Sequence, residues 1–116
     1  MKLFLFLVIL SVNSWAEITV PKMTRPIIDE TNQVDVKVIQ ELESKIFQVY
    51  KNKEGPQLQV LVVSSLNGYS VEEVAEKVFN TWGLGNGQRD DGVLFLVAIK
   101  DRKMRIEVGY GLEGAL

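Results

Sequence analysis

Three short groups of polar residues in this sequence are of types that can bind ions or substrates. Asp90-Asp91-Gly92 separates a glycine-rich run from an apolar run, Asp29-Glu30 follows a short apolar run, and Ser64-Ser65 ends another. Adjacent carboxylates repel each other unless water, a cationic side chain such as Arg89 or a metal ion stabilises them. Calcium takes about six to eight oxygen ligands, which an acidic, glycine-rich loop can supply. For Asp90-Asp91 alone, a solvated turn is the stronger interpretation and a cation site the alternative.

Residues that the sequence lacks exclude several other chemistries. The 116 residues include no His and no Cys. The commonest general base and metal ligand is therefore missing, together with the Ser-His and Cys-His nucleophile pairs. A disulfide-linked partner is excluded as well. The net charge is −2 and the basic residues are scattered, which argues against nucleic acid as a partner.

The glycine-rich run 83–87 resembles a phosphate-binding loop only superficially. A dinucleotide fingerprint follows a strand and opens a helix, whereas this run follows an expected helix and opens an expected strand. We interpret it as a connector whose glycines permit positive φ angles.

The first 16 residues have the pattern of a secretory signal peptide. Lys2 precedes an apolar run over 3–12, and Ser14 and Ala16 stand three residues and one residue before an expected cleavage site. The run is too short to span a bilayer, which needs roughly 20 residues. We expect export across the inner membrane, with an extended lead-in over 17–26 and one domain over 27–116.

Periodicity predicts an α/β domain with a small mixed sheet. Asp35 is expected to cap a helix ending near Tyr50, with one inward stripe of apolar residues: Ile39, Leu42, Ile46, Val49 and Tyr50. The run 58–64 predicts a central strand, Ser70 caps a helix that ends at Gly83, and 93–99 predicts a second buried strand. These elements form a βαβ unit with a right-handed crossover.

The last expected strand, over 104–108, should form an antiparallel hairpin with the run 93–99. Met104, Ile106 and Val108 alternate with Arg105 and Glu107, so we expect the polar pair on the wet face. If the earlier strands are parallel, Ser64-Ser65 and Asp29-Glu30 lie at the same edge of the sheet, where α/β proteins bind ligands. Trp82 completes a helical stripe and is expected in the core.

Several of these segments together resemble the TPM domain, a family found in thylakoid photosystem II repair proteins and in exported bacterial proteins. The resemblance covers about Ile27 to Leu116. It rests on Asp29-Glu30, 58–63, 79–85, 89–97 and above all the run Arg105-Ile-Glu-Val-Gly-Tyr-Gly-Leu-Glu-Gly-Ala-Leu116. Members usually continue with a further helical segment, so this sequence resembles a domain truncated at its C-terminal end.

The resemblance implies a three-layer α/β/α sandwich and an extracytoplasmic location, often with a downstream membrane anchor. Divalent cations, calcium above all, have been associated with some members, and acid phosphatase activity with the plant branch. By position, Asp29, Asp90 and Asp91 match acidic residues of the family, and we carry them forward as candidate metal ligands.

Two functions follow as hypotheses. The first is a non-enzymatic binding module, calcium-responsive, that supports a membrane protein or complex. The alternative is a metal-assisted phosphatase acting on phosphate esters. We favour the binding module because no nucleophile and base can be paired in the sequence. The sequence leaves the oligomeric state open.

Overall fold

The fold is a four-stranded mixed sheet between two helices. The computed structural model describes residues 17–50, 55–85, 87 and 90–113. The predicted signal peptide, Arg89 and residues 114–116 lie outside the described residues. The elements in chain order are β1 (Ile27–Asp29), α1 (Val36–Val49), β2 (Gln57–Val63), α2 (Val71–Trp82), β3 (Gly92–Ala98), β4 (Lys103–Val108) and the 3-10 turn η2 (Tyr110–Leu112).

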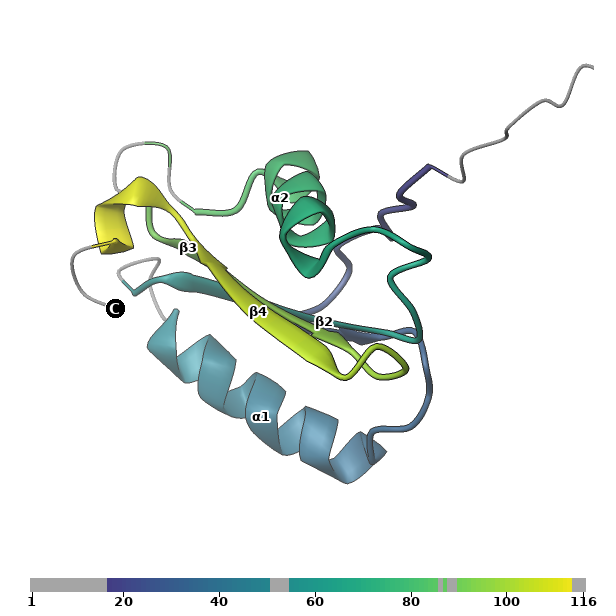
Figure 1. The fold of residues 1–116 in the computed structure, drawn as a ribbon. Helices are drawn as coiled ribbons and strands as arrows, with labels where there is room; N and C mark the ends of the chain where they lie inside the picture. The colour runs from purple at the N-terminus through teal and green to yellow at the C-terminus, as the bar shows by residue number, and fades with distance from the viewer. Residues whose placement is uncertain (1–16, 51–54, 86, 88–89, 114–116) are drawn as a thin grey trace, which may run out of the picture.

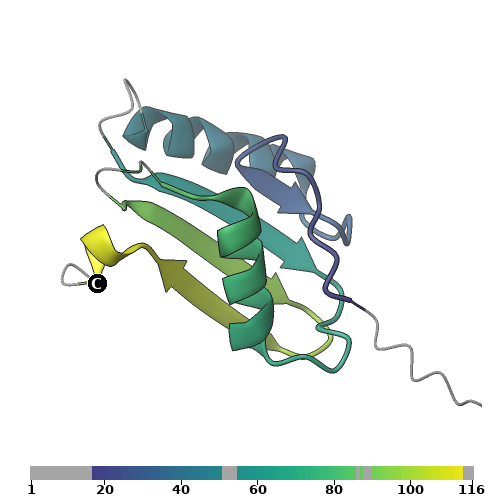
Figure 2. The ribbon, with the colours of Figure 1, turned by 90° about the horizontal axis from the view of Figure 1, so that it is seen from above.

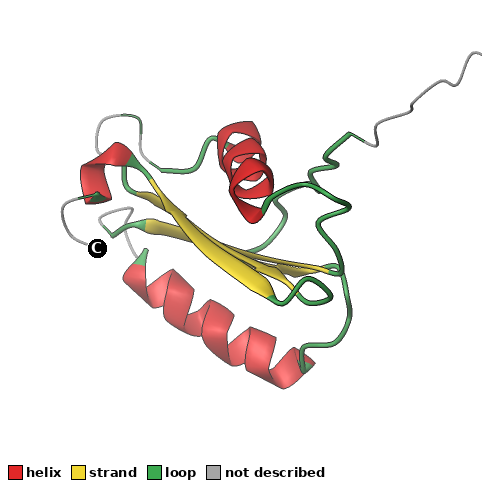
Figure 3. Ribbon diagram, in the orientation of Figure 1, coloured by secondary structure: helices red, strands yellow, loops and turns green. Residues whose placement is uncertain are grey.

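The sheet has the strand order β1-β2-β3-β4, with β1, β2 and β3 parallel and β4 antiparallel to β3. Helix α2 covers one face and α1 the other, which confirms the predicted three layers (Figures 1 and 3). Helix α1 connects β1 to β2 and helix α2 connects β2 to β3, so both connections move across the sheet in the same direction, but on opposite faces. Their crossovers therefore have opposite hands: β2-α2-β3 is right-handed as predicted, and β1-α1-β2 has the rarer left hand (Figure 2).

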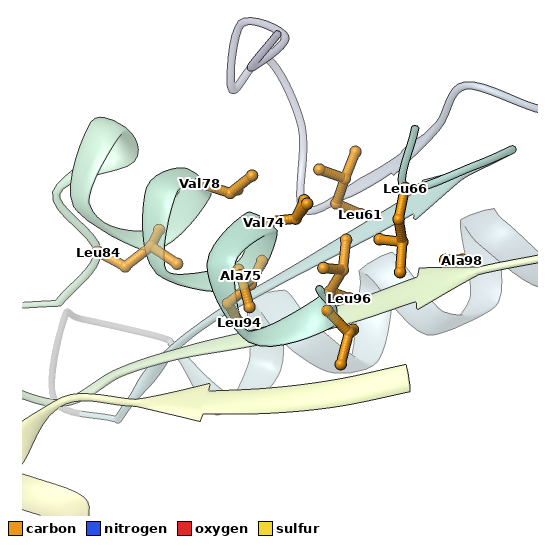
Figure 4. Packing of buried hydrophobic residues seen from close by; sticks show 10 residues of the cluster. Leu61, Leu66, Val74, Ala75, Val78, Leu84, Leu94, Leu96 and Ala98 are labelled. Atoms are coloured by element: carbon orange, nitrogen blue, oxygen red, sulfur yellow. The ribbon is translucent and has the colours of Figure 1, made fainter. Parts of the chain in front are cut away.

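The main core lies between α2 and the sheet. Ser70 caps α2 because its Oγ accepts the N–H of Glu73 at 3.1 Å, and Gly83 ends the helix at φ 58°. The face between these caps packs against Leu61 of β2 and Leu94 and Leu96 of β3, all at most 1% exposed (Figure 4). Trp82, which was expected in the core, is only partly buried and packs against it, and its Nε1–H donates to the carbonyl of Pro21 at 2.8 Å.

Helix α1 covers less of the sheet than its apolar pattern predicts. The Asp35 cap is confirmed, since its carboxylate accepts the N–H of Lys37 at 2.7 Å. Of the predicted inward stripe, however, only Ile39 is buried, while Leu42 and Val49 are 44% and 57% exposed. Their exposure means that the sheet face beside α1 is only partly covered.

The other buried residue of α1 is an acid. Glu43 forms an ion pair with Arg25, whose Nε donates to Glu43 Oε2 at 2.9 Å. The backbone N–H of Ile27 points at the same oxygen from 3.4 Å. Hydrogen bonding from Arg25 lowers the pKa of Glu43, although burial acts in the opposite direction. This pair fastens α1 to the start of β1.

The two faces of β4 are exposed in the opposite sense to the prediction. Met104 and Ile106 are 63% and 57% exposed, whereas Arg105 and Glu107 are half-buried. Arg105 and Glu107 are paired with Leu96 and Leu94, which lie on the face that α2 covers. The apolar residues of β4 therefore lie on the α1 side, where no described helix reaches them. Within the described residues, no helix has the length and apolar character needed to span a membrane.

Candidate functional site

The candidate site is a crevice at the carboxyl ends of the parallel strands. After β1 the chain turns to α1 on one face, and after β2 it turns to α2 on the other (Figure 1). Neighbouring strands whose connections leave in opposite directions create the crevice in which open α/β sheets bind ligands. A cleft of about 360 Å³ lies there, lined by Glu30 after β1, Ser64 and Ser65 after β2, and Lys100 after β3. The predicted common edge of Asp29-Glu30 and Ser64-Ser65 is thus confirmed.

The backbone fixes the walls of this crevice. The N–H of Glu30 donates to the carbonyl of Val62 at 3.0 Å, and the N–H of Lys100 donates to that of Ser64 at 2.9 Å. On the β2-α2 loop, the N–H of Leu66 donates to the Asp101 carboxylate at 2.7 Å. The three strand ends are therefore tied to one another before any ligand arrives, which lowers the ordering cost of binding.

Most polar side chains of the crevice can donate hydrogen bonds. Its described lining includes the Lys100 ammonium, the Asn67 amide, and the hydroxyls of Ser64 and Ser65. The Ser65 hydroxyl already accepts the N–H of Asn67 at 3.0 Å and keeps its own O–H for donation. Glu30 supplies the carboxylate of the described lining. Such a set of donors suits an anionic group such as a phosphate or a carboxylate.

Asp29, a predicted metal ligand, points away from this crevice and holds the turn that leads into α1. Its Oδ1 accepts the N–H and the hydroxyl of Thr31 at 2.9 and 2.5 Å, and its Oδ2 accepts the N–H of Val34 at 2.9 Å. Burial raises the pKa of Asp29, but the hydrogen bonds from Thr31, Val34 and Gln33 outweigh burial and lower it below its ordinary value. Asp29 lines a separate cleft on the α1 side.

Asp90 and Asp91 lie at the other end of the sheet, in a tightly packed backbone junction. Asp90 is exposed with φ 46°, and its carbonyl accepts the N–H of Gly111 at 3.1 Å. Asp91 is 6% exposed, and its carbonyl accepts the N–H of Gln57 at 3.1 Å. A Cβ on Gly109 would lie 2.1 Å from the Asp90 carbonyl oxygen, so only glycine fits there. The glycines near this acidic pair thus serve close backbone packing.

The fold does not bring the three predicted metal ligands together. Asp29 is level with Val62 and hence with Val97, five residues along β3 from Gly92. At about 3.3 Å per residue this separates Asp29 from the start of β3 by roughly 17 Å. Among the described residues, no three acidic side chains are close enough to share an ion. Asp29, Asp90 and Asp91 therefore do not fit one common calcium site, and we route no chemistry through such an ion.

Sequence reasoning missed Lys100 and Asn67 as lining residues of the crevice. In the sequence Lys100 follows the strand expected over 93–99, and Asn67 precedes Gly68. The sequence did contain a signal for Lys100, which directly follows a buried parallel strand. The carboxyl end of that strand had to reach the same edge of the sheet as Ser64. Applying the strand-end rule to all three strands would have found Lys100.

Comparisons with known proteins agree with this architecture. The family model labelled TPM_phosphatase, described as the TPM domain, matches residues 27–116. The solution NMR structure of the N-terminal domain of a protein from P. gingivalis is similar, with TM-score 0.69 and 25% identity over 78% of this chain and 57% of that chain. The N-terminal domain of the cg2496 protein from Corynebacterium glutamicum has TM-score 0.66 and 18% identity over 84% and 62%. No curated protein matches.

The fold is a small α/β/α domain with a crevice at the carboxyl ends of its parallel strands. The match over residues 27–116 covers more than half of the chain, and the chain belongs to the TPM domain family. It spans about three fifths of the length of the two solved relatives, at 57% and 62%.

Proposed function

We propose that this TPM domain is a non-enzymatic binding module whose ligand site is the crevice at the carboxyl ends of β1, β2 and β3. The proposal rests on a cleft of about 360 Å³ lined by Ser64, Ser65 and Lys100. It lies where the chain leaves β1 toward one face of the sheet and β2 toward the other. The lining donors favour an anionic group, and the exposed Lys100 supplies the positive charge.

The lining supports binding better than turnover. The sequence has no His to act as a base for either serine. In the described structure the Ser65 hydroxyl is already engaged by the N–H of Asn67, which suits a positioned hydrogen-bonding group. We therefore expect the crevice to hold an anionic group of a partner without breaking a bond in it.

The partner and location are proposed from the family resemblance and the expected signal peptide. We propose that the mature domain is exported and supports a membrane-associated protein or complex. Calcium binding is a separate part of this proposal. It concerns Asp90 and the glycine-rich loop beside it, because Asp29 lies at the opposite end of the sheet.

Binding of inorganic phosphate, measured by isothermal titration calorimetry, tests the site. We expect Lys100→Ala to abolish the heat of binding and Lys103→Ala to leave it unchanged, because Lys103 is also exposed but lies outside the crevice lining. Equal binding by the two variants would refute the assignment of the crevice.

The word phosphatase in the family label favours a second candidate function, hydrolysis of phosphate esters. Release of phosphate from a generic aryl phosphate, with calcium, with magnesium and with a chelator, separates the two functions. A pure binding module releases none under any condition. Turnover that is lost in Ser64→Ala or Lys100→Ala would establish the phosphatase and overturn the non-enzymatic proposal.

A further inference from the structure

The outer edge of β4 is open and has an unusual alternation of residues. β4 pairs with β3 on one side, and no strand of the described chain pairs with its other side. Along it, exposed Met104 and Ile106 alternate with the charged Arg105 and Glu107. Edge strands are usually protected against pairing with another chain, so an open edge with exposed apolar residues is a candidate site for such pairing.

The ladder with β3 determines which backbone groups of β4 face outward. The N–H of Gly109 donates to the carbonyl of Gly92 at 2.8 Å, which makes this residue pair a hydrogen-bonded one. Hydrogen-bonded pairs alternate with non-bonded ones in an antiparallel ladder, so Glu107, Arg105 and Lys103 bond toward β3. The N–H and C=O groups of Met104, Ile106 and Val108 therefore point away from β3, toward the open edge.

We propose that two copies of this chain associate through β4, pairing antiparallel about Ile106 to form a continuous eight-stranded sheet. In this register Ile106 pairs with its own copy, and Met104 of one copy pairs with Val108 of the other. All three residues have their backbone groups directed outward. The partner strand is thus offered hydrogen bonds and an apolar surface at the same positions.

Charge selects this register over its neighbours. With Ile106 at the centre, Arg105 of one copy lies opposite Glu107 of the other, twice by symmetry. Sliding the pair by two residues one way places Arg105 opposite Arg105, although it also places Lys103 opposite Glu107, and sliding it the other way places Glu107 opposite Glu107. Like charges directly opposite each other are destabilising, and of these three registers only the proposed one has opposite-charge pairs without a like-charge pair. Within one chain Arg105 Nε already donates to Glu107 Oε2 at 3.0 Å, so association extends an existing pair into a two-by-two cluster of alternating charges.

The contact involves few residues, so the dimer is expected to be weak. One pair of six-residue strands buries less than the roughly 1,200 Å² of a stable interface. We expect a dissociation constant between micromolar and millimolar, which sedimentation equilibrium over that concentration range can measure. A monomer at every concentration would overturn the proposal and leave the edge to a strand of a different protein.

A charge-swap series tests the register. Arg105→Glu and Glu107→Arg each place like charges opposite each other and should weaken association about tenfold or more. The double variant restores opposite charges and should restore dimerisation. An equimolar mixture of the two single variants should form a heterodimer. Lys103→Glu is the matched control on the same strand face and should have no effect, because residue 103 lies opposite Gly109 of the partner copy. Failure of the double variant to recover would contradict the proposed register.

Cross-linking gives a second test that does not depend on affinity. The sequence contains no Cys, so Ile106→Cys introduces a single thiol at an exposed position. Its Cα should lie about 5.5 Å from that of its copy, within the range for a disulfide. Met104→Cys is the control, because its copy would lie four residues away along the strand, about 14 Å. We expect rapid oxidation to a dimer for Ile106→Cys only. Equal rates for both variants would refute the pairing.

Discussion

Replacing Asp29 by alanine tests whether this carboxylate is a structural group of the β1-α1 turn. The substitution removes the acceptor of the two hydrogen bonds from Thr31, the one from Val34 and the one from the backbone of Gln33. A hydrogen bond to a charged group contributes about 1.5–3 kcal/mol when buried. Because the Asp29 side chain is only partly buried, hydrogen bonds to water replace part of the lost stabilisation. We therefore expect a total loss of about 2–3 kcal/mol in the free energy of unfolding. Urea unfolding at pH 7 measures it. Asp35→Asn is the matched control, since asparagine caps a helix about as well as aspartate.

The pH dependence of this loss gives a second check on Asp29. Its pKa in the folded protein lies below the ordinary 3.8, because hydrogen bonds from Thr31, Val34 and Gln33 outweigh the effect of burial. A carboxyl group whose pKa is lowered by folding contributes stability. This stability is fully present above the pKa of the unfolded state and disappears as the pH falls through the pKa of the folded state. The difference between wild type and Asp29→Ala should therefore be constant near neutrality and shrink below pH 3.8.

Calcium separates the structural role of Asp29 from the role of a metal ligand. The destabilisation by Asp29→Ala should be the same in calcium and in chelator, because the lost contacts are with the protein itself. A loss below about 0.5 kcal/mol, or one that appears only with calcium, would refute the structural role.

Three further predictions concern other parts of the fold. Gly109→Ala should lower the free energy of unfolding by about 1–3 kcal/mol, because its Cβ would overlap the Asp90 carbonyl, whereas Gly87→Ala, with open space around it, should change it little in the same urea experiment. Ser70→Ala should cost about 1 kcal/mol through loss of the α2 cap, and Ser70→Asp should recover most of it; equal unfolding midpoints for Ser70→Ala and the wild type would contradict the cap. If calcium binds beside Asp90, calcium at about 100 times its dissociation constant should add roughly 2.7 kcal/mol to the wild type, seen as a higher melting temperature, and less to Asp90→Ala; melting curves unchanged by calcium and magnesium would remove that hypothesis.

Much of the fold follows from local patterns in the sequence. The caps Asp35, Ser70 and Gly83, and the apolar runs of β2 and β3, are short-range signals, and each was found in its predicted place. The parallel strands then determined that Glu30 and Ser64 reach one edge. The half of the candidate site that depends on strand direction was therefore predictable.

The remaining features depend on long-range contacts that periodicity does not encode. Alternation shows that Met104 and Ile106 share a face, but only the position of α2 shows that the opposite face is covered. An acid such as Glu43 on the inner side of α1 is buried because Arg25, 18 residues earlier, pairs with it. By contrast, the separation of Asp29 from Asp90 was open to prediction, because Asp29 ends one parallel strand and Asp90 precedes another.

Chemical-shift mapping by NMR tests the proposed ligand site most directly. Adding inorganic phosphate to ¹⁵N-labelled protein should shift the backbone amide signals of residues 64–69 and of Lys100, which form and flank the crevice, and these shifts should be lost in Lys100→Ala. Shifts confined to residues 85–92 and 109–111, or no shifts at any phosphate concentration, would contradict a ligand site at the carboxyl ends of the strands.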